Sequence, residues 1–416
     1  MTSTLREKDT TARPRLRRDL GRDELVNGAV GALFAMTGPV AVILAVGRTA
    51  DLPQATVASW VFGIFVLNGL LTIAASLAYR QPLGFFWTIP GTVVVGQALS
   101  SSLTWPEVIG AYLLAAALML GLGLTGRVDR VMDLLPMPVV MAMVAGVFLR
   151  FGTDLVLAVE SDAALAAPMV VAFVAATAVP RLGRWLPPIL AALAVGVLVV
   201  LLTGRVDEGS TAGPWLAAPV LQTPVFTWSA AVELVVPLVI TVLVVQNGQG
   251  MAVLQGAGHR PPMNMVTVAC GLVSVPAAMV GAVSTCLTGP TNALLTASGE
   301  RTRHYAAAVW CGVLAVVFGC LAPGMVRMML SMPEAFVATL GGLAMLKALQ
   351  GAFGAAFCGT YATGALVTFL VTVTDITVLN ISAAFWGLVV GLVVSRLVEP
   401  RDFRTEIART AEAASG

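Results

Sequence analysis

Long apolar runs, separated by short polar segments, fill this sequence from Leu25 to Val398. Several runs reach the roughly 20 residues that a helix needs to cross a lipid bilayer. Hydrophobic residues make up 58% of the 416 residues and charged residues only 11%, whereas a soluble domain has about 25% charged residues. Because a helix satisfies its own backbone hydrogen bonds in lipid, the chain is predicted to be an all-helical membrane protein.

The apolar runs divide into fourteen predicted membrane segments, in two sets of seven. The segments are 25–46, 55–78, 83–100, 106–124, 134–158, 163–180 and 187–203, then 229–254, 263–283, 285–296, 304–324, 328–352, 361–377 and 379–398. Seven basic residues precede the first segment, and most other basic residues fall in loops on the same side. The positive-inside rule therefore predicts that both termini are cytoplasmic. A full-length span follows the basic start, so no cleavable signal peptide is predicted.

An odd number of segments in each set means that the two halves insert with opposite orientations. This inverted-repeat plan is typical of secondary transporters. The predicted organisation is a cytoplasmic basic N-terminal tail (1–23), a first repeat (24–204), an extracytoplasmic connector (205–228), a second repeat (229–398) and a cytoplasmic C-terminal tail (399–416).

The third segment of each half is short and broken. These segments are FFWTIPGTVVVGQALSSS (Phe85–Ser102) and STCLTGPTNALLTAS (Ser284–Ser298). Broken backbone survives at membrane depth only against protein or a water-filled cavity, and two such segments in matched positions indicate a binding site. Each half-helix is expected to begin near Pro90 or Pro290, and two opposed helix N-termini suit an anion. The alternative is that both sequences are tolerated kinks in ordinary spans.

The predicted substrate site combines the two breaks with a polar stretch in the eighth segment. Aromatic side chains beside the first break offer flat apolar faces, and threonines and amides offer hydrogen bonds. The amides could instead join helices to one another. The predicted substrate-binding residues are Thr37, Phe86, Trp87, Thr88, Pro90, Gly91, Gln246, Asn247, Gln249, Thr288, Gly289, Pro290, Thr291 and Asn292.

At these residues the chain resembles the benzoate–proton symporter family of bacterial inner membranes. The matching pieces are a Trp-x-x-Pro-Gly break (Trp87–Gly91) and the stretch QNGQGMAVLQGAGHRPP (Gln246–Pro262). Gln249 stands where relatives often carry proline. The resemblance implies a core domain that holds the half-helices, a gate domain that moves against it, and proton-driven uptake of an aromatic carboxylate such as benzoate.

The wider relatives of this family leave two alternative functions, a nucleobase–proton symporter and an anion transporter or channel of the same fold. Nucleobase permeases generally carry acidic residues where this chain has Gln246–Asn247 and Thr291–Asn292, which disfavours the first alternative. A membrane-embedded enzyme would need a catalytic set such as HExxH, and the sequence contains none. The chain is therefore not predicted to be an enzyme.

Two acidic residues are candidates for coupling transport to a proton, because an ionisable residue inside a span is a functional candidate. Glu233 lies near the start of the eighth segment, where it can reach the interface, and Asp375 lies deeper in the thirteenth. Protonation of the substrate itself, or a water chain, would need neither. No metal site, cofactor or nucleic-acid partner is predicted, since the five cysteines lie in or beside apolar runs and His259 and His304 in polar loops. The sequence leaves a homodimer open.

Overall fold

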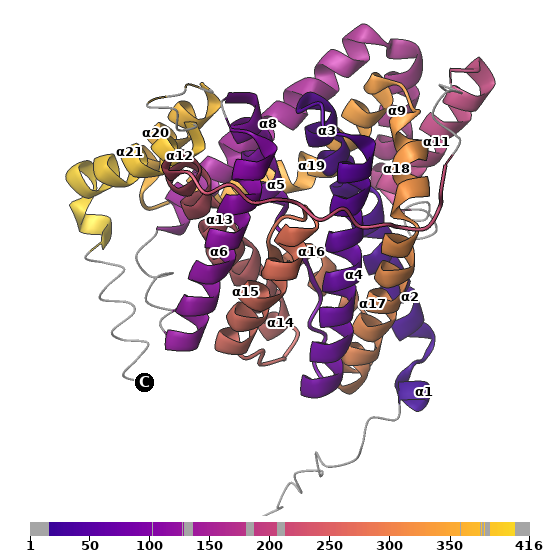
Figure 1. Ribbon diagram of the computed structural model, residues 1–416, viewed down its shortest axis with the longest axis horizontal. Coiled ribbons are helices and arrows are strands. Elements are labelled where there is room, and N and C mark those ends of the chain that lie inside the picture. Colours follow the sequence, from indigo (N-terminus) through magenta and orange to yellow (C-terminus); the bar gives the residue numbers. More distant parts are fainter. Residues whose placement is uncertain are drawn as a thin grey trace, which may run out of the picture.

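The computed structural model describes residues 16–101, 103–126, 128, 136–179, 187–205, 213–357, 359–374, 376, 378 and 383–403. Helices make up most of this part of the chain (Figure 1). In the first half the elements are α1 (Leu16–Asp19), α2 (Arg22–Met36), α3 (Gly38–Thr49), α4 (Gln54–Tyr79), β1 (Phe85–Trp87), α5 (Ile89–Ser101), α6 (Trp105–Thr125), α8 (Met137–Ser161), α9 (Ala163–Ala178) and α11 (Pro188–Thr203).

The second half repeats this order of elements, with one short strand in each half followed by a short helix at the matched place. Its eighth span contains two π-helical turns, η2 and η3. The elements are α12 (Trp228–Ala230), η2 (Ala231–Val235), α13 (Val236–Ile240), η3 (Thr241–Asn247), α14 (Gly248–Gly256), α15 (Met263–Met279), β2 (Thr285–Leu287), α16 (Gly289–Leu295), η4 (Arg301–Arg303), α17 (His304–Cys320), α18 (Ala322–Leu330), α19 (Glu334–Phe357), α20 (Ala362–Val373) and α21 (Ala383–Val398).

Seven helical segments of the described chain are long and apolar enough to cross a membrane. Shorter apolar helices, including α5, α9, α11, α15, α20 and α21, supplement them. Two predicted boundaries were wrong. The predicted segments 304–324 and 328–352 are divided instead into α17, the short α18 and α19. Pro323 is the second residue of α18 and Pro333 precedes α19. Proline is favoured at the first positions of a helix and disfavoured in its interior.

Helix packing follows an internal two-fold pattern that relates the two halves. Helix α4 packs on α17, and its counterpart α15 packs on α6, which is the counterpart of α17. In the same way α9 packs on α11 and on α19, while α20 packs on α21 and on α8. Helices α8 and α19, which correspond to each other, pack together. The fold is therefore an inverted repeat.

Glycines allow the closest of these helix contacts. A Cβ atom added to Gly69 of α4 would lie 2.8 Å from the carbonyl oxygen of Gly312 in α17. At the matched contact, a Cβ atom on Gly271 of α15 would lie 2.6 Å from the backbone nitrogen of Leu120 in α6. Small residues drive helix association in membranes because they let backbones approach. Both contacts join the first half to the second.

The loops gather at two opposite ends of the bundle. We call one end the Arg260 end, because the Gln81 side chain after α4 exchanges two 3.1 Å hydrogen bonds with the backbone of Arg260 there. At the same end, Asn27 of α2 donates to the carbonyl oxygen of Ser298 (3.0 Å). At the other, the connector end, residues 213–227 run across the helix ends (Figure 1). There the guanidinium of Arg327 donates to the carbonyl oxygens of Pro214 (2.7 Å) and Gly213 (2.9 Å).

Candidate functional site

The two broken segments meet at the centre of the fold, as predicted. Strands β1 and β2 pair antiparallel, with Phe86 opposite Cys286. Beyond the strands, the N–H of Thr88 donates to the Ser284 carbonyl oxygen (3.1 Å), and the N–H of Thr288 donates to the Gly84 carbonyl oxygen (3.2 Å). Because the strands run in opposite directions, α5 and α16 leave the pair in opposite directions, and both helices begin beside it.

Hydroxyl groups from neighbouring helices satisfy the outer edges of this two-stranded sheet. The Thr72 hydroxyl of α4 accepts from the Phe85 N–H (2.8 Å) and donates to its carbonyl oxygen (3.1 Å). In the other half, the Ser274 hydroxyl of α15 accepts from the Thr285 N–H (2.9 Å). An unsatisfied backbone group costs several kcal/mol in lipid, so these hydroxyls make the strands tolerable inside a membrane protein.

Two asparagines that the sequence suggested as substrate contacts hold this frame together. Asn292 donates from Nδ2 to the carbonyl oxygens of Gly84 (3.0 Å) and Thr288 (2.7 Å), and its Oδ1 accepts from the Gly84 N–H (2.9 Å). Asn247 accepts at Oδ1 from the Leu287 N–H (2.8 Å) and contacts the Cys270 thiol at 3.8 Å. Both amides are fully buried, and their hydrogen bonds go to the protein.

A small pocket lies between the starts of the two half-helices and the break between α2 and α3. Its enclosed volume is about 10 Å³, which is room for about one water molecule. The rings of Phe86 and Trp87 form one wall and pack edge-on against Phe65, at centroid distances of 6.0 and 5.3 Å. The lining residues are Phe34, Ala35, Pro39, Phe86, Trp87, Ile89, Gln246, Thr288, Pro290 and Thr291.

Two polar atoms of this pocket have no hydrogen-bond partner among the residues that the structure describes. They are Oε1 of Gln246 and Nε1 of Trp87, on side chains that are 4% and 1% exposed. Nearly all buried polar groups in proteins are hydrogen-bonded, so an acceptor and a donor left over beside one pocket point to a ligand. Rotation of the Gln246 amide would present its two N–H groups instead. The pair can therefore bind a carboxyl group in either protonation state.

The sequence prediction divides into residues that line this pocket and residues that build its frame. Six predicted residues line it: Phe86, Trp87, Gln246, Thr288, Pro290 and Thr291. The others, outside the lining, are Thr37, Thr88, Pro90, Gly91, Asn247, Gln249, Gly289 and Asn292.

The frame residues have identifiable tasks. The Thr88 hydroxyl accepts from the Gly91 N–H (3.1 Å) at the start of α5. The Thr37 hydroxyl donates to the Leu33 carbonyl oxygen (2.8 Å) at the end of α2. A Cβ atom on Gly289 would lie 2.8 Å from the Gln249 Cβ atom. These residues fix the backbone on which the pocket is built.

Four lining residues are not among the predicted substrate-binding residues: Phe34, Ala35, Pro39 and Ile89. The signal that could have found three of them is the Thr-Gly-Pro sequence at Thr37–Pro39, which divides the first span into α2 and α3. A helix break inside the core brings the residues on both sides of it beside the cavity that the break borders.

The expectation that Glu233 can reach the interface was wrong. Its side chain is 0% exposed, since η2 packs on α5 and α6. It lies in a π-helical turn, a feature that is frequent at functional sites. The other acidic candidate, Asp375, lies outside the described residues.

The two histidines also differ from the sequence expectation of solvated loops. His259 and His304 are 7% and 6% exposed, and Nε2 of His259 lies 3.1 Å from Nδ1 of His304. Burial first, and then the neighbouring His304 and Arg301, lowers the pKa of His259 to about 4. His259 is therefore neutral at pH 7 and joins the α14–α15 loop to the start of α17. No group of side chains able to hold a metal ion occurs within the described ranges.

Comparison with known proteins matches the chain to a protein family. The family model described as benzoate membrane transport protein matches residues 19–397. The chain is 28% identical over 389 residues to the inner membrane protein YdcO of Escherichia coli (strain K12), covering 91% of this chain and 97% of that protein. It is 26% identical over 390 residues to the benzoate membrane transport protein of Acinetobacter baylyi, covering 92% and 97%.

Solved structures share this fold, and one of them is a bicarbonate transporter by its title. The structure of SLC26A9 superposes with a TM-score of 0.63 at 14% identity, covering 90% of this chain and 64% of that one. The transmembrane domain of the cyanobacterial bicarbonate transporter BicA superposes with a TM-score of 0.58 at 14% identity, covering 90% and 98%. At this level of identity the likeness establishes the fold alone.

Proposed function

Because the chain belongs to the benzoate membrane transport protein family, we propose that it imports benzoate or a closely related aromatic carboxylate together with a proton. The proposed location is the bacterial cytoplasmic membrane, with the Arg260 end and both termini in the cytoplasm and the connector end outside. In this proposal the protein is a carrier rather than an enzyme. The proposed mechanism needs no cofactor or metal.

The observation that carries the proposal is the pocket between the half-helices. Its rings, from Phe34, Phe86 and Trp87, offer flat apolar faces that suit an aromatic ring. Its unsatisfied polar atoms, on Gln246 and Trp87, suit a carboxyl group. The start of α5 adds a positive dipole end that favours a negative charge.

A proton makes the uptake of a monovalent anion electroneutral. The interior-negative membrane potential opposes entry of an anion by about 2.3 kcal/mol per charge per 100 mV, and a co-transported proton cancels that charge. We propose that Glu233 carries the proton, because it is a fully buried carboxyl group in the same span as Gln246. Asp375 remains the second candidate, proposed from its sequence position alone.

Uptake of labelled benzoate into proteoliposomes tests this function. Acidifying the outside should raise uptake, and acidifying the lumen should reduce it. Benzamide, which keeps the ring and loses the charge, should compete poorly, and so should uracil and bicarbonate. If benzamide or uracil competes as well as benzoate, the proposed carboxylate site is wrong and a nucleobase-type site is supported instead. If bicarbonate competes as well as benzoate, an inorganic anion is the better candidate substrate.

Two further measurements separate carrier from channel and locate the proton. A carrier exchanges labelled for unlabelled benzoate in counterflow, whereas a channel does not. Glu233→Gln should keep counterflow and lose accumulation driven by a pH gradient, since exchange needs no net proton movement. If Glu233→Gln still accumulates benzoate in response to the gradient, Glu233 is not the proton carrier.

A further inference from the structure

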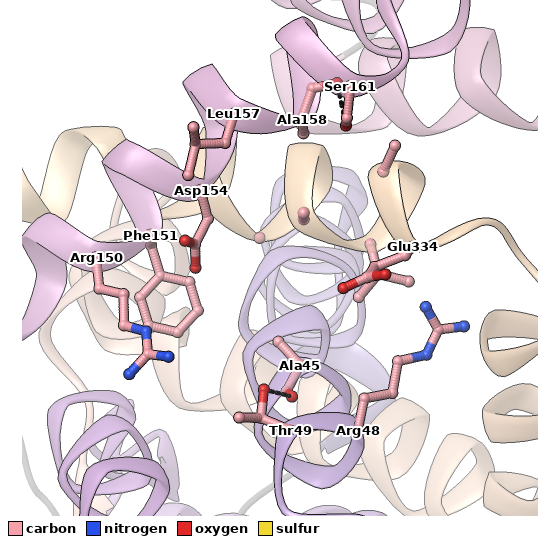
Figure 2. Close-up of a pocket in the computed structure, with 14 residues that line it drawn as sticks. Ala45, Arg48, Thr49, Arg150, Phe151, Asp154, Leu157, Ala158, Ser161 and Glu334 are labelled. Atoms are coloured by element: carbon pink, nitrogen blue, oxygen red, sulfur yellow. Dashed lines mark hydrogen bonds between the residues drawn. The ribbon is translucent and has the colours of Figure 1, made fainter. Parts of the chain in front are cut away.

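A second and larger cavity lies away from the half-helix pocket, at the connector end of the bundle. It encloses about 810 Å³ between the end of α3, the second half of α8 and the start of α19 (Figure 2). Pockets that bind small molecules typically enclose about 300–1,000 Å³. The half-helix pocket has room for about one water molecule, so the larger cavity is where an aromatic acid fits without rearrangement.

Charged side chains from three helices face this cavity. Arg150 and Asp154 of α8 lie on one side, and Arg48 of α3 and Glu334 of α19 lie on the other (Figure 2). Arg48 donates to the Met332 carbonyl oxygen (2.9 Å), which holds its guanidinium at the rim. Two guanidiniums and two carboxylates leave the cavity without net charge.

Apolar walls accompany the charges. The Phe151 ring lies beside Arg150, and Ala45 and Leu157 line the same cavity (Figure 2). Guanidinium groups bind carboxylates through paired N–H donors, and an aromatic ring packs on an apolar or aromatic face. The cavity therefore offers both halves of an aromatic carboxylate a complementary surface.

Helix α3 links this cavity to the half-helix pocket. Pro39 at its start lines the small pocket, and Arg48 near its end lines the large one. At a rise of 1.5 Å per residue, these positions are about 14 Å apart along the helix. Helix α19 packs along α3, and Gly341, which lines the large cavity, faces Ala41. The two cavities therefore lie along one helix, α3, and the packed α3–α19 interface separates them.

We propose that this cavity is an outer binding site, in which the guanidinium of Arg48 or of Arg150 holds the carboxylate of an aromatic acid before it passes along α3 to the half-helix pocket. The inference rests on the proposed function and adds a second substrate site to it. The two carboxylates, Asp154 and Glu334, weaken the hold on an anion and favour its onward release.

The outer site is tested by removing positive charges from the cavity in some variants and a negative charge in another. Initial rates of benzoate uptake are measured at pH 7 in right-side-out membrane vesicles, at low and at high salt. Arg150→Gln and Arg48→Gln should each raise KM roughly threefold to tenfold at low salt, because each removes a guanidinium that can pair with the carboxylate. The effect should be smaller at high salt, which screens the attraction between exposed charges. Glu334→Gln should lower KM. Maximal rates should stay within about twofold.

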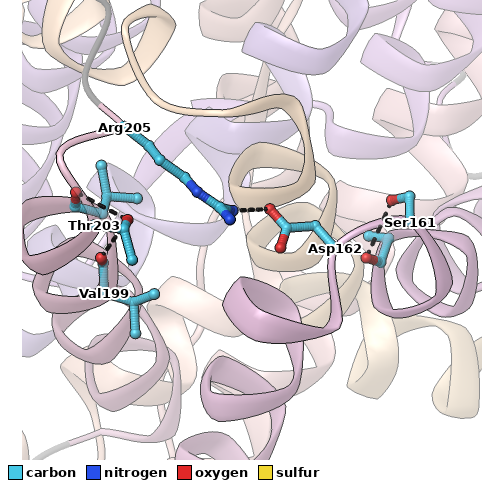
Figure 3. A network of polar contacts seen from close by, with 7 residues as sticks. Ser161, Asp162, Val199, Thr203 and Arg205 are labelled. Carbon is cyan, nitrogen blue, oxygen red and sulfur yellow. Dashed lines mark hydrogen bonds and ion pairs between the residues drawn. The ribbon is translucent and has the colours of Figure 1, made fainter.

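A matched control is Arg205→Gln. Arg205, after α11, forms a 2.7 Å ion pair with Asp162 at the same end of the bundle (Figure 3), and it does not line the cavity. Its replacement removes one positive charge from that end and should leave KM unchanged. Folding of every variant is checked by the amount of monodisperse protein in detergent. If Arg48→Gln does not fold, the KM values of Arg150→Gln and Glu334→Gln test the outer site.

The outcomes separate the outer site from the function on which it rests. Absence of benzoate uptake by the wild type would overturn the proposed function. An active wild type with unchanged KM in Arg150→Gln and Arg48→Gln would overturn the outer site alone. A raised KM in Glu334→Gln would also overturn it, because a purely structural cluster is disturbed by either charge removal.

Discussion

Gln246 and Asn247 are neighbours in the eighth span and yet should respond in opposite ways to replacement by alanine. The Gln246 Oε1 atom has no hydrogen-bond partner among the described residues and lies beside the half-helix pocket. The Asn247 Oδ1 atom accepts from the N–H of Leu287 in β2 (2.8 Å). We expect Gln246→Ala to impair substrate binding and Asn247→Ala to impair folding.

The magnitudes follow from what each replacement leaves behind. A hydrogen bond to a charged ligand is worth about 1.5–3 kcal/mol, so Gln246→Ala should weaken benzoate binding roughly tenfold to hundredfold. The Oε1 atom that it removes has no partner among the described residues. Asn247→Ala deprives the buried Leu287 N–H of its acceptor, which costs about 1–3 kcal/mol of stability. Cys270 is too weak an acceptor to replace the amide.

Two assays on the same preparations separate the effects. Thermal stability in detergent without substrate should be unchanged in Gln246→Ala and clearly reduced in Asn247→Ala. Benzoate titration of the folded fraction should show a higher Kd in Gln246→Ala and a nearly unchanged Kd in Asn247→Ala. If Gln246→Ala binds benzoate like the wild type while losing stability, Gln246 joins helices and the pocket assignment is wrong.

Two further perturbations test the frame. Between pH 6.5 and about 4 the unfolded chain binds a proton at His259 that the folded chain excludes, because burial lowers the pKa of His259 to about 4. The stability from neutral His259 is therefore present above pH 6.5 and lost towards pH 4, and His259→Gln should flatten the melting temperature across that range. Gly250→Ala should lower the free energy of unfolding by about 1–3 kcal/mol, since the new Cβ atom would lie 2.5 Å from the Leu287 carbonyl oxygen. The control is Gly256→Ala on the same helix, whose Cβ atom meets nothing within 4 Å. Equal melting temperatures of the two variants would contradict this packing.

Local sequence signals were sufficient to predict the broken segments. Proline and glycine at Pro90, Gly91, Gly289 and Pro290 act on the backbone within a turn of where they stand, so the start of each half-helix can be predicted without knowing its neighbours. The equal offset of the two breaks within their halves predicted that they would meet. The strand pairing between Phe86 and Cys286 follows from that meeting.

The division of labour among the amides could not be predicted in the same way. Asn292 bonds to Gly84, which is 208 residues away, and Asn247 bonds to Leu287, 40 residues away. Whether an amide serves the frame or the pocket depends on which backbone group the fold brings within 3 Å of it. The hydropathy of the surrounding sequence is the same for Gln246 and Asn247, so composition carries no information on that choice.

The frame and the pocket together indicate which part of the site has to move. Both strands and the starts of both half-helices are fixed by buried hydrogen bonds from Thr72, Ser274, Asn247 and Asn292, and moving any of them would leave backbone groups unpaired. The pocket they border has room for about one water molecule, and an aromatic acid is several times larger than a water molecule. The remaining wall consists of residues around the α2–α3 break, where the Thr37 hydroxyl donates to the Leu33 and Phe34 carbonyl oxygens of α2 itself. Space for a substrate is therefore expected to open by displacement of α2 and α3 from the half-helices, which is also the side from which α3 leads to the cavity at Arg48.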